Sequence, residues 1–516
     1  LVPAARNKQT ASQKKRATRY FVPAAQYHTS KIQECRDKVP EKGTPMLKTK
    51  IVCTLGPASN STEMIEKMIE AGMNVARLNF SHGTYEEHEA VIERLKEVRT
   101  RMQVPLAIML DTKGPEVRIR KFDGGSAVLE TGADFTLTTD DVLGDASRVT
   151  ISYDRLPGEL SPGDRVLLDD GNIELTVREC VEHEIRCTVT AGGLLRNGKG
   201  GHMPHMSEKD KCDLLFGIRH DVDFVAASFI RSQEDVVGMR KFLDYNGGHQ
   251  IRIISKIENL EGVGNFDEIL DSSDGIMVAR GDMGVEVPFE RLPGLQKRFI
   301  KACYQSGKMV VTATQMLESM IEHPNPTRAE ISDVANAVFD GTSAVMLSGE
   351  TAMGKYPLRA VRAMAKIAEQ AEEDACQMDA YDGMRYAVDY NDVTNAVCDA
   401  ACTTARDSRA KAIITMTATG RSARRMSKFR PIEPIVAATP DAKTFHQLSL
   451  SWGVYPVLAL TQDTQEALFR HAVDCAKQLS IVEKGDRVVI CAGIPVGRNC
   501  NTNTIKVEVV DENRDL

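Results

Sequence analysis

The chain has 516 residues, which is too many for one hydrophobic core and predicts about three domains at roughly 100–200 residues each. Its 42% hydrophobic and 27% charged residues are typical of globular proteins, and no apolar run is long enough to cross a membrane. The formal net charge of −7 argues against nucleic acid as the main partner. Twelve scattered cysteines without a C-x-x-C pair favour reduced thiols in a cytoplasmic protein.

Residues 1–45 differ in composition from the rest of the chain. They are rich in Lys, Arg, Gln, Ser and Thr, and their acidic residues are limited to Glu34, Asp37 and Glu41. No hydrophobic periodicity runs through them, so we expect a basic, flexible N-terminal arm. An organellar transit segment is one interpretation, and a tag, extension or regulatory tail is the other.

From Lys50 onward, strand-like runs alternate with amphipathic helical segments. Eight parallel strands with helices between them predict a closed (β/α)8 TIM barrel, formed by residues 46–115 and 206–372, with its active site at the carboxyl ends of the strands. The eight strand-like runs are Ile51–Thr54, Val75–Leu78, Leu106–Leu110, Phe224–Ala227, Ile251–Ser255, Gly275–Ala279, Val310–Thr312 and Ala344–Leu347.

Polar residues follow nearly every one of these runs. Lys256 and Glu258 stand two residues apart, so an extended chain points both side chains to the same side. A converging set of charges at the strand ends predicts a catalytic rim, whereas a structural ion-pair network is the alternative for the Lys–Glu pair alone. The residues that follow the strands are Arg77 to His82, Asp111, Thr112, Ser228, Lys256, Glu258, Asp282, Thr314 and Ser348.

The barrel is interrupted by residues 116–205, whose short strand-like runs are separated by Gly, Asp and Pro turns. The pattern predicts a small antiparallel β-barrel. Because it is inserted after the third strand, it emerges on the catalytic face and could close over the site as a lid. The expected strands are Phe135–Thr139, Arg165–Leu168, Ile173–Val177 and Ile185–Thr190.

Residues 373–516 alternate helices and strands again and predict a separate C-terminal α/β domain. Its first strand, Ala412–Met416, leads into a loop of hydroxyls, Gly and Arg that opens a helix. Such a loop can bind the phosphate of an effector through backbone N–H groups, although a simple helix N-cap is an equal alternative. The candidate effector-binding residues are Thr417, Thr419, Gly420, Arg421 and Ser422.

Several segments resemble those of pyruvate kinases from about Lys48 to the end of the chain. They read TKIVCTLGPAS, NVARLNFSHG, LDTKGPEVR, ISKIEN, SDGIMVARGDMGVE, TATQMLESM, PTRAEISDVANAVFDGTSAVMLSGETA and TATGRSARRMSKFRP. The resemblance implies a catalytic barrel, a lid, an effector-binding last domain and, usually, a homotetramer. It implies transfer of a phosphoryl group from phosphoenolpyruvate to ADP, which gives pyruvate and ATP.

The resemblance also implies two metal sites. Glu258 and Asp282 match the ligands of a divalent cation, Mg²⁺ or Mn²⁺, and both supply the oxygen donors that Mg²⁺ requires. A K⁺ site corresponds to Asn79, Ser81, Asp111 and Thr112, and Glu116 is the residue type found in K⁺-dependent members.

Substrate and nucleotide contacts follow in the same way. Lys256 matches the lysine that contacts the moving phosphoryl group, and Arg77 matches the residue that holds the substrate phosphate. Thr314 and Ser348 resemble the relay that delivers a proton to the enolate carbon. The substrate-binding set is Arg77, Lys256, Gly281, Asp282 and Thr314, and the nucleotide contacts are Asn79, His82, Arg118 and Lys199.

The chain departs from the family pattern at four places. Ile119 and Arg120 replace a common Thr-Gly, and residues 200–207 form a shorter segment than usual. Met353 stands in place of a frequent basic residue, and Thr419 in place of a frequent Ser. The carboxyl end lacks the aromatic and basic loop of sugar-bisphosphate-activated forms, so the identity of a phosphorylated small-molecule effector stays open.

Two other functions fit part of the pattern. A Mg²⁺-dependent 2-keto-acid lyase or aldolase would also use a Glu and an Asp on a barrel, but it needs no nucleotide cover. A non-catalytic sensor or scaffold would keep the C-terminal loop and bind a partner through the basic arm, but it would not need an intact rim.

Overall fold

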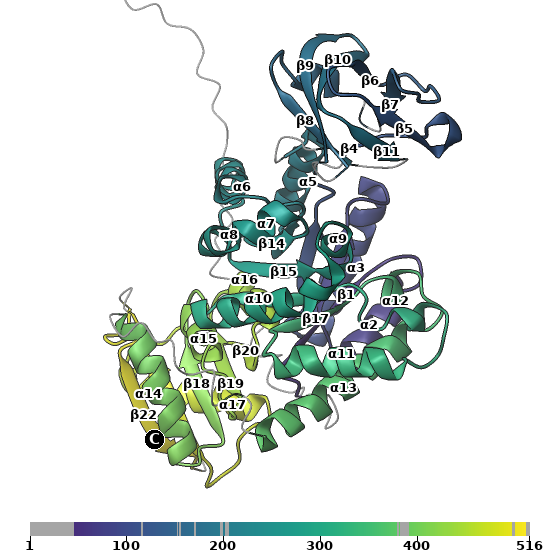
Figure 1. Cartoon of the computed structure of the whole chain (residues 1–516). Coiled ribbons are helices and arrows are strands. Elements are labelled where there is room, and N and C mark those ends of the chain that lie inside the picture. Colours follow the sequence, from purple (N-terminus) through teal and green to yellow (C-terminus); the bar gives the residue numbers. More distant parts are fainter. Residues whose placement is uncertain are drawn as a thin grey trace, which may run out of the picture. The chain divides into compact units, whose positions relative to one another are not determined.

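The computed structural model describes residues 46–114, 117–151, 153, 156–169, 172–196, 200–201, 206–378, 381, 392–497 and 501–511 (Figure 1). Residues Glu41–Leu516 form one compact unit. The arm predicted for residues 1–45 lies outside the described part, as do Glu116 and Lys199. None of the helices in the described part is both long and apolar enough to span a bilayer.

Eight parallel strands close into a barrel, which confirms the predicted (β/α)8 fold. Around the barrel the order is β1, β2, β3, β13, β14, β15, β16 and β17, and β17 pairs with β1. Their near-continuous apolar runs are explained by burial on both faces, because helices cover the outside and side chains fill the inside. The strands are β1 Lys50–Thr54, β2 Met73–Asn79, β3 Ala107–Asp111, β13 Phe224–Ala227, β14 Arg252–Ile257, β15 Gly275–Ala279, β16 Met309–Ala313 and β17 Ala344–Leu347.

Six of the barrel helices, α2, α3, α5, α6, α7 and α11, begin at a residue whose side chain caps the first turn, and three of these have complete capping boxes, formed by Thr84, Ser207 and Thr327. Between β14 and β15 the chain forms two short helices, α7 and α8, which meet at Asn265. The Asn265 side chain donates to the carbonyl of Arg231 (2.9 Å). The helices are α2 Thr62–Glu70, α3 Tyr85–Met102, α5 Glu208–Arg219, α6 Gln233–Tyr245, α7 Leu260–Gly264, α8 Phe266–Ser272, α9 Arg280–Glu286, α10 Leu292–Ser306, α11 Arg328–Phe339, α12 Gly349–Ala352 and α13 Pro357–Gln377.

The insert is β-structure with its own apolar core, as expected. Its main sheet has seven strands in the order β4, β12, β8, β9, β10, β6 and β7, and β5 pairs with β11 in a second sheet. The main sheet is antiparallel except that β6 and β7 run parallel, so it is less regular than the antiparallel barrel that the sequence predicts. The elements are β4 Val117–Arg118, β5 Ser126–Leu129, β6 Asp134–Thr138, β7 Arg148–Thr150, α4 Leu156–Glu159, β8 Arg165–Leu168, β9 Ile173–Val181, β10 Glu184–Ala191, β11 Gly193–Arg196 and β12 Gly200–Gly201.

The C-terminal part is a five-stranded α/β sheet in the order β20, β19, β18, β21 and β22, and only β22 is antiparallel to its neighbour. The predicted boundary at residue 372 lies inside the continuous helix α13, and the division into domains at that point stays a prediction. The elements are α14 Val393–Asp407, β18 Ala412–Met416, α15 Arg421–Ser427, β19 Ile435–Thr439, α16 Ala442–Gln447, β20 Val454–Leu458, α17 Gln465–Gln478, β21 Arg487–Ala492 and β22 Thr504–Val509.

The C-terminal part contacts the amino-terminal end of the barrel. Lys443 forms an ion pair with Asp221 (2.7 Å) and donates to the carbonyl of Val222 (2.6 Å), just before β13. Gln447 donates to the carbonyl of Gln250 (2.7 Å), just before β14. Leu450 is fully buried in the apolar cluster inside the barrel. These contacts leave the opposite, carboxyl-terminal rim as the end where loops can form a site.

Candidate active site

Three charged side chains from three barrel strands meet at the carboxyl-terminal rim. Arg77, at the end of β2, donates from Nε to Asp111 Oδ2 (2.6 Å), at the end of β3. Arg77 Nη1 also donates to Thr54 Oγ1 (2.8 Å), the last residue of β1. Lys256, from β14, places Nζ 3.2 Å from Asp111 Oδ1. The expected convergence of Arg77, Asp111 and Lys256 is therefore a direct, buried network.

Glu258 follows β14 and joins the same network. Its Oε1 lies 2.9 Å from Lys256 Nζ, and its Oε2 accepts from the backbone N–H of Phe229 (2.6 Å). Although burial lowers the pKa of Lys256, Asp111 and Glu258 outweigh it and keep the pKa above its ordinary value. Burial also opposes the ionisation of Asp111, but Arg77 and Lys256 hold its pKa below the usual range. Both Lys256 and Asp111 are therefore charged near neutral pH.

Burial has a different result at Glu258. It raises the pKa of Glu258 to about 7, and the nearby charge of Asp282 adds to the shift against the opposing effect of Lys256. Oε1 accepts no well-directed hydrogen bond despite the short ion pair. Asp282 lies near the start of helix α9 and is exposed. Two carboxylates, one of them with a buried oxygen short of partners, could hold a divalent cation, because such cations prefer oxygen ligands.

Ser228 also belongs to this network, although the sequence analysis named it only as a residue at a strand end. Its hydroxyl donates to Asp111 Oδ1 (3.2 Å) and the Thr112 carbonyl (2.7 Å), and it accepts from Lys256 Nζ (2.8 Å). The Ser228 backbone N–H donates to Thr112 Oγ1 (3.2 Å). Ser228 thus links the ends of β3, β13 and β14. Its position directly after the buried run Phe224–Ala227 was the available signal, but a lone Ser carries little information.

Thr314 lies just after β16 in a left-handed conformation, with φ of +64°, and Gln315 follows with φ of +53°. Such backbone strain persists only where surrounding contacts hold it. The guanidinium of Arg280 donates to the carbonyls of Thr314 (2.7 Å) and Gln315 (3.0 Å) and pairs with Asp333 (2.7 Å). Arg280 therefore holds the Thr314 loop in place, a role that sequence analysis missed.

The hydroxyl of Thr314 connects this loop to helix α9. Thr314 Oγ1 accepts from the backbone N–H of Gly281 (2.8 Å), so the two predicted substrate-binding residues are in direct contact. Ser348, after β17, is fixed by Glu350, which accepts from the N–H groups of Ser348 (2.7 Å) and Leu317 (3.1 Å). Buried Glu350 thus ties the loops after β16 and β17 together, and it too was missed.

The candidates after β2 are more exposed. Asn79 Oδ1 accepts from the N–H of Ser81 (3.1 Å), and the Asn79 carbonyl accepts from the N–H of His82 (3.3 Å). Among the predicted nucleotide contacts, Arg118 is described only as a backbone position in β4, and Lys199 lies outside the described residues. The residue linked to K⁺ dependence, Glu116, lies outside them as well.

In the predicted effector loop, Thr417, Gly420 and Ser422 are buried and hydrogen-bonded within the protein, whereas Thr419 and Arg421 are exposed. Thr417 Oγ1 accepts from the N–H of Gly420 (3.0 Å), which has a φ of +73°. Ser422 Oγ is bonded to Thr502 Oγ1, and the carbonyl of Thr419 accepts from Arg424. Arg421 is exposed and lies 3.4 Å from Asp392.

Comparison with known proteins identifies the family. The model for the barrel domain of pyruvate kinase matches residues 46–361, and the model for its alpha/beta domain matches residues 395–508. A pyruvate kinase of Clostridium acetobutylicum is 47% identical over 90% of this chain and 100% of its own length. Those of Geobacillus stearothermophilus and Clostridium perfringens are 46% and 44% identical over 90% of this chain, and over 81% and 100% of their own lengths. The chain therefore belongs to the pyruvate kinase family, whose members transfer a phosphoryl group from phosphoenolpyruvate to ADP to give pyruvate and ATP.

Proposed function

We propose that Lys256, Arg77, Glu258, Asp282, Thr314 and Ser348 form the centre at which this phosphotransfer takes place. One observation carries the proposal. The ammonium of Lys256 is buried between Asp111 (3.2 Å) and Glu258 (2.9 Å), beside the guanidinium of Arg77. A buried cation with fixed partners costs no reorganisation when negative charge develops next to it, and this is the usual source of catalytic power in phosphoryl transfer.

Arg77 and Lys256 have distinct roles in the proposal. Arg77 is anchored by Asp111 and Thr54, so its remaining N–H groups are oriented to hold the phosphate of phosphoenolpyruvate. Lys256 contacts the transferred phosphoryl group and the enolate oxygen. Its charge is balanced by two carboxylates in the resting site, which keeps the ammonium in place without leaving a lone buried charge.

Glu258 and Asp282 fit a divalent cation, Mg²⁺ or Mn²⁺, since both are oxygen donors and Glu258 Oε1 lacks a well-directed hydrogen bond. When bound between Glu258 and Asp282, the cation would supply positive charge that offsets the negative charge of the reacting oxygens. The backbone N–H of Phe229 donates to Glu258 Oε2 and so fixes the orientation of this carboxylate. The family depends on divalent metal and on K⁺ in general. Here Asn79, Ser81, Asp111 and Thr112 are the proposed K⁺ ligands, and all four offer oxygen atoms.

Thr314 and Ser348 are proposed to deliver the proton that converts the enolate into pyruvate. Arg280 fixes the Thr314 loop, and Glu350 fixes the backbone of Ser348, so both hydroxyls are carried by restrained segments. The backbone N–H of Gly281 is proposed to bind the substrate carboxylate. That N–H donates to Thr314 Oγ1 in the structure, so binding of the carboxylate would remove this bond and leave the Thr314 hydroxyl with its bond to the Ala313 carbonyl (2.6 Å).

The remaining parts of the proposal rest on the resemblance to the family. Asn79, His82, Arg118 and Lys199 contact ADP, and a phosphorylated small molecule regulates the enzyme through the loop from Thr417 to Ser422. The inward hydrogen bonds of that loop would have to be exchanged for bonds to the effector. We further propose a homotetramer in the cytoplasm.

The proposal is tested by measuring pyruvate formation from phosphoenolpyruvate with the purified full chain. Pyruvate should appear only when ADP, Mg²⁺ and K⁺ are all present, and ATP should form in equal amount. Release of pyruvate from a longer 2-keto acid, with no turnover of phosphoenolpyruvate, would instead identify a lyase, and absence of any turnover with an intact fold would identify a sensor or scaffold. The Lys256→Met and Thr314→Ala variants then separate phosphoryl transfer from protonation of the enolate. Only protonation incorporates a proton from solvent, so ATP formation reports the first step and solvent-proton incorporation into pyruvate reports the second.

A further inference from the structure

The loop after β2 carries proposed site residues on exposed backbone. Asn79 ends the strand, and Ser81 and His82 follow it, exposed, before helix α3 begins. The N–H of Ser81 donates to Asn79 Oδ1 (3.1 Å), and the N–H of His82 donates to the Asn79 carbonyl (3.3 Å). Exposed loops move more than the elements that they connect, so a defined position for His82 needs a further contact.

That contact comes from His88, near the start of α3. Its Nε2 lies 2.9 Å from the carbonyl oxygen of His82. A carbonyl can only accept a hydrogen bond, so Nε2 carries the proton of the neutral ring. Burial lowers the pKa of His88 against the opposing effect of this bond, and the ring is therefore neutral near pH 7. Its one N–H is used to hold the loop.

The ring of His88 is itself held in place by stacking. It lies almost parallel to the ring of Phe80, with centroids 4.0 Å apart and planes 10° apart. Phe80 is buried and packs on Phe216 of α5, at 5.4 Å between centroids. Tyr85 stacks on the same Phe216 and donates from its hydroxyl to buried Asp213 of α5 (2.6 Å). The support under His88 thus belongs to the packed body of the barrel.

The chain between His82 and His88 fits closely around their bond. Gly83 has a φ of +82°, and a Cβ added there would lie 3.3 Å from His88 Nε2 and 3.1 Å from Glu87 Oε2. Glu87 in turn accepts from the N–H of Thr84 (2.9 Å) and completes the capping box of α3. The turn is therefore fixed at the helix end, and His88 extends this restraint to His82.

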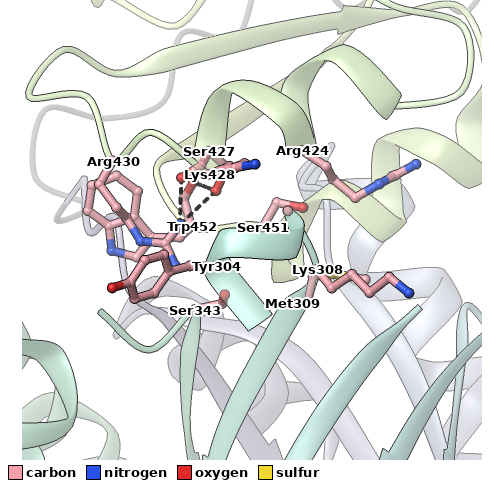
Figure 2. Close-up of a pocket in the computed structure, with 11 residues that line it drawn as sticks. Tyr304, Lys308, Met309, Ser343, Arg424, Ser427, Lys428, Arg430, Ser451 and Trp452 are labelled. Atoms are coloured by element: carbon pink, nitrogen blue, oxygen red, sulfur yellow. Dashed lines mark hydrogen bonds between the residues drawn. The ribbon is translucent and has the colours of Figure 1, made fainter. Parts of the chain in front are cut away.

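A ring and a carbonyl bond also fix Arg430 at the amino-terminal end of the barrel, and Figure 2 shows Arg430 beside Trp452. Its guanidinium lies 4.7 Å from the Trp452 ring, and Nη2 donates to the Gly341 carbonyl (2.8 Å). There the arrangement joins the barrel to the C-terminal part and has a structural role. The carbonyl that His88 holds differs, because it belongs to a residue proposed to contact a substrate.

We propose that His88 is a positioning residue for the nucleotide. By holding the carbonyl of His82, it fixes the imidazole of His82 where ADP binds. The inference rests on the proposed contact between His82 and ADP. Phosphoenolpyruvate is proposed to bind at Arg77 and Lys256, which have other anchors, so loss of the His88 bond should weaken the binding of ADP and spare that of phosphoenolpyruvate.

Two substitutions of His88 in the full-length protein separate the hydrogen bond from the packing. His88→Leu keeps an apolar contact with Phe80 and removes the donor, so the KM for ADP should rise about fivefold, the effect of one lost hydrogen bond. Both kcat and the KM for phosphoenolpyruvate should stay near wild type. His88→Gln carries an amide nitrogen at the same number of bonds from Cα as Nε2, so it should restore the KM for ADP.

His220 provides a matched control. It is also a half-buried histidine against an aromatic ring, 4.2 Å from that of Phe216, and it lies 3.6 Å from Glu89 at the far end of α5. His220→Leu therefore removes a comparable side chain away from the loop after β2. It should leave the KM for ADP unchanged.

A double variant tests whether His88 acts through His82. His82→Ala should raise the KM for ADP, and His82→Ala combined with His88→Leu should show the same KM as His82→Ala alone. Once the imidazole is gone, there is nothing left for His88 to position, so the two effects should not add.

Four results would overturn the proposal: an unchanged KM for ADP in His88→Leu or in His82→Ala, an equal rise in His88→Gln or His220→Leu, an equal rise in the KM for phosphoenolpyruvate, or additive effects in the double variant. Pyruvate formation by the wild type without any need for ADP would contradict the proposed function itself. The wild-type assay therefore tells the two failures apart.

Discussion

Replacement of Lys256 by Met is the most direct test of the rim, because it removes the ammonium and keeps a side chain of similar length. In the structure Nζ lies 2.9 Å from Glu258 and 3.2 Å from Asp111. A phosphoryl or enolate oxygen that displaces these partners would approach to a similar distance. If it gains about half a unit of negative charge in the transition state, a cation about 3 Å away stabilises it by about 3 kcal/mol at an effective dielectric constant near 20.

We therefore expect Lys256→Met to lower kcat on the order of 10²-fold, since each 1.4 kcal/mol is about a factor of ten. The concentration of Mg²⁺ that gives half-maximal activity should change much less, because both carboxylates of the proposed metal site remain. The assay is the steady-state rate of pyruvate formation at saturating phosphoenolpyruvate and ADP, with Mg²⁺ varied. A variant with kcat within about threefold of wild type, less than about 0.7 kcal/mol, would refute the role given to Lys256.

Lys443→Met provides the matched control. Lys443 is as buried as Lys256 and also pairs with an aspartate, but it lies at the opposite end of the barrel. Its removal should lower the thermal stability, because it leaves buried carbonyls and a carboxylate without a donor, and it should leave kcat near the wild-type value. Equal losses of kcat in the two variants would mean that the effect of Lys256 is one of stability alone.

Three further predictions concern the loop that carries Thr314, a buried histidine and the K⁺ requirement. Arg280→Lys keeps the positive charge, but a lysine cannot donate to several carbonyls at once as Arg280 does. The variant should therefore release the strained Thr314 backbone and lower kcat about tenfold, with little change in the KM for the substrates. Arg298→Lys, at an exposed ion pair, is the control and should leave kcat unchanged. Burial, reinforced by neighbouring Arg99, lowers the pKa of His446 to about 4, so its contribution to stability is complete above its unfolded pKa near 6.5 and is lost as pH falls toward 4. The free energy of unfolding of wild type should fall between about pH 6.5 and 4, and His446→Gln should reduce this fall by roughly 2 kcal/mol. Urea unfolding at several pH values measures it, and an equal fall in the variant and wild type would contradict the prediction. Glu116→Lys should allow turnover in K⁺-free buffer, and a K⁺ requirement equal to that of wild type would count against its role.

The barrel was predictable because its strands are buried on both faces and therefore read as short continuous apolar runs. Once the strands were placed, Arg77, Asp111 and Lys256 were placed as well, since each ends a strand or lies next to its end. The positions of the charges depended only on strand register. Apart from one shift between Ile51 and Val52 in the pairing of β1 with β2, the barrel strands keep their register, so the strand ends meet at one rim and separation along the chain mattered little.

The supporting residues were not predictable in the same way. Arg280 follows β15 but bonds the loop after β16, and Glu350 follows β17 but bonds Leu317 in that same loop. These contacts depend on how two loops fold toward each other, which leaves no periodic signal. The parallel pairing of β6 and β7 was missed for a related reason, because β7 has only three residues and pairs through a long connection.

Gly114 lies where the chain leaves the barrel for the insert, and its close neighbours leave no room for a side chain at this position. It has a φ of +74°, and a Cβ added there would lie 2.8 Å from the Ser228 side chain and 2.7 Å from the ring of Phe229. Ser228 is hydrogen-bonded to Lys256, and the N–H of Phe229 holds Glu258. Sequence drift within the inserted sheet is therefore tolerable so long as its own core persists, whereas a side chain at Gly114 would press on the two residues that hold Lys256 and Glu258. The evolutionary freedom of the insert thus stops at Gly114, shortly after strand β3 of the barrel ends at Asp111.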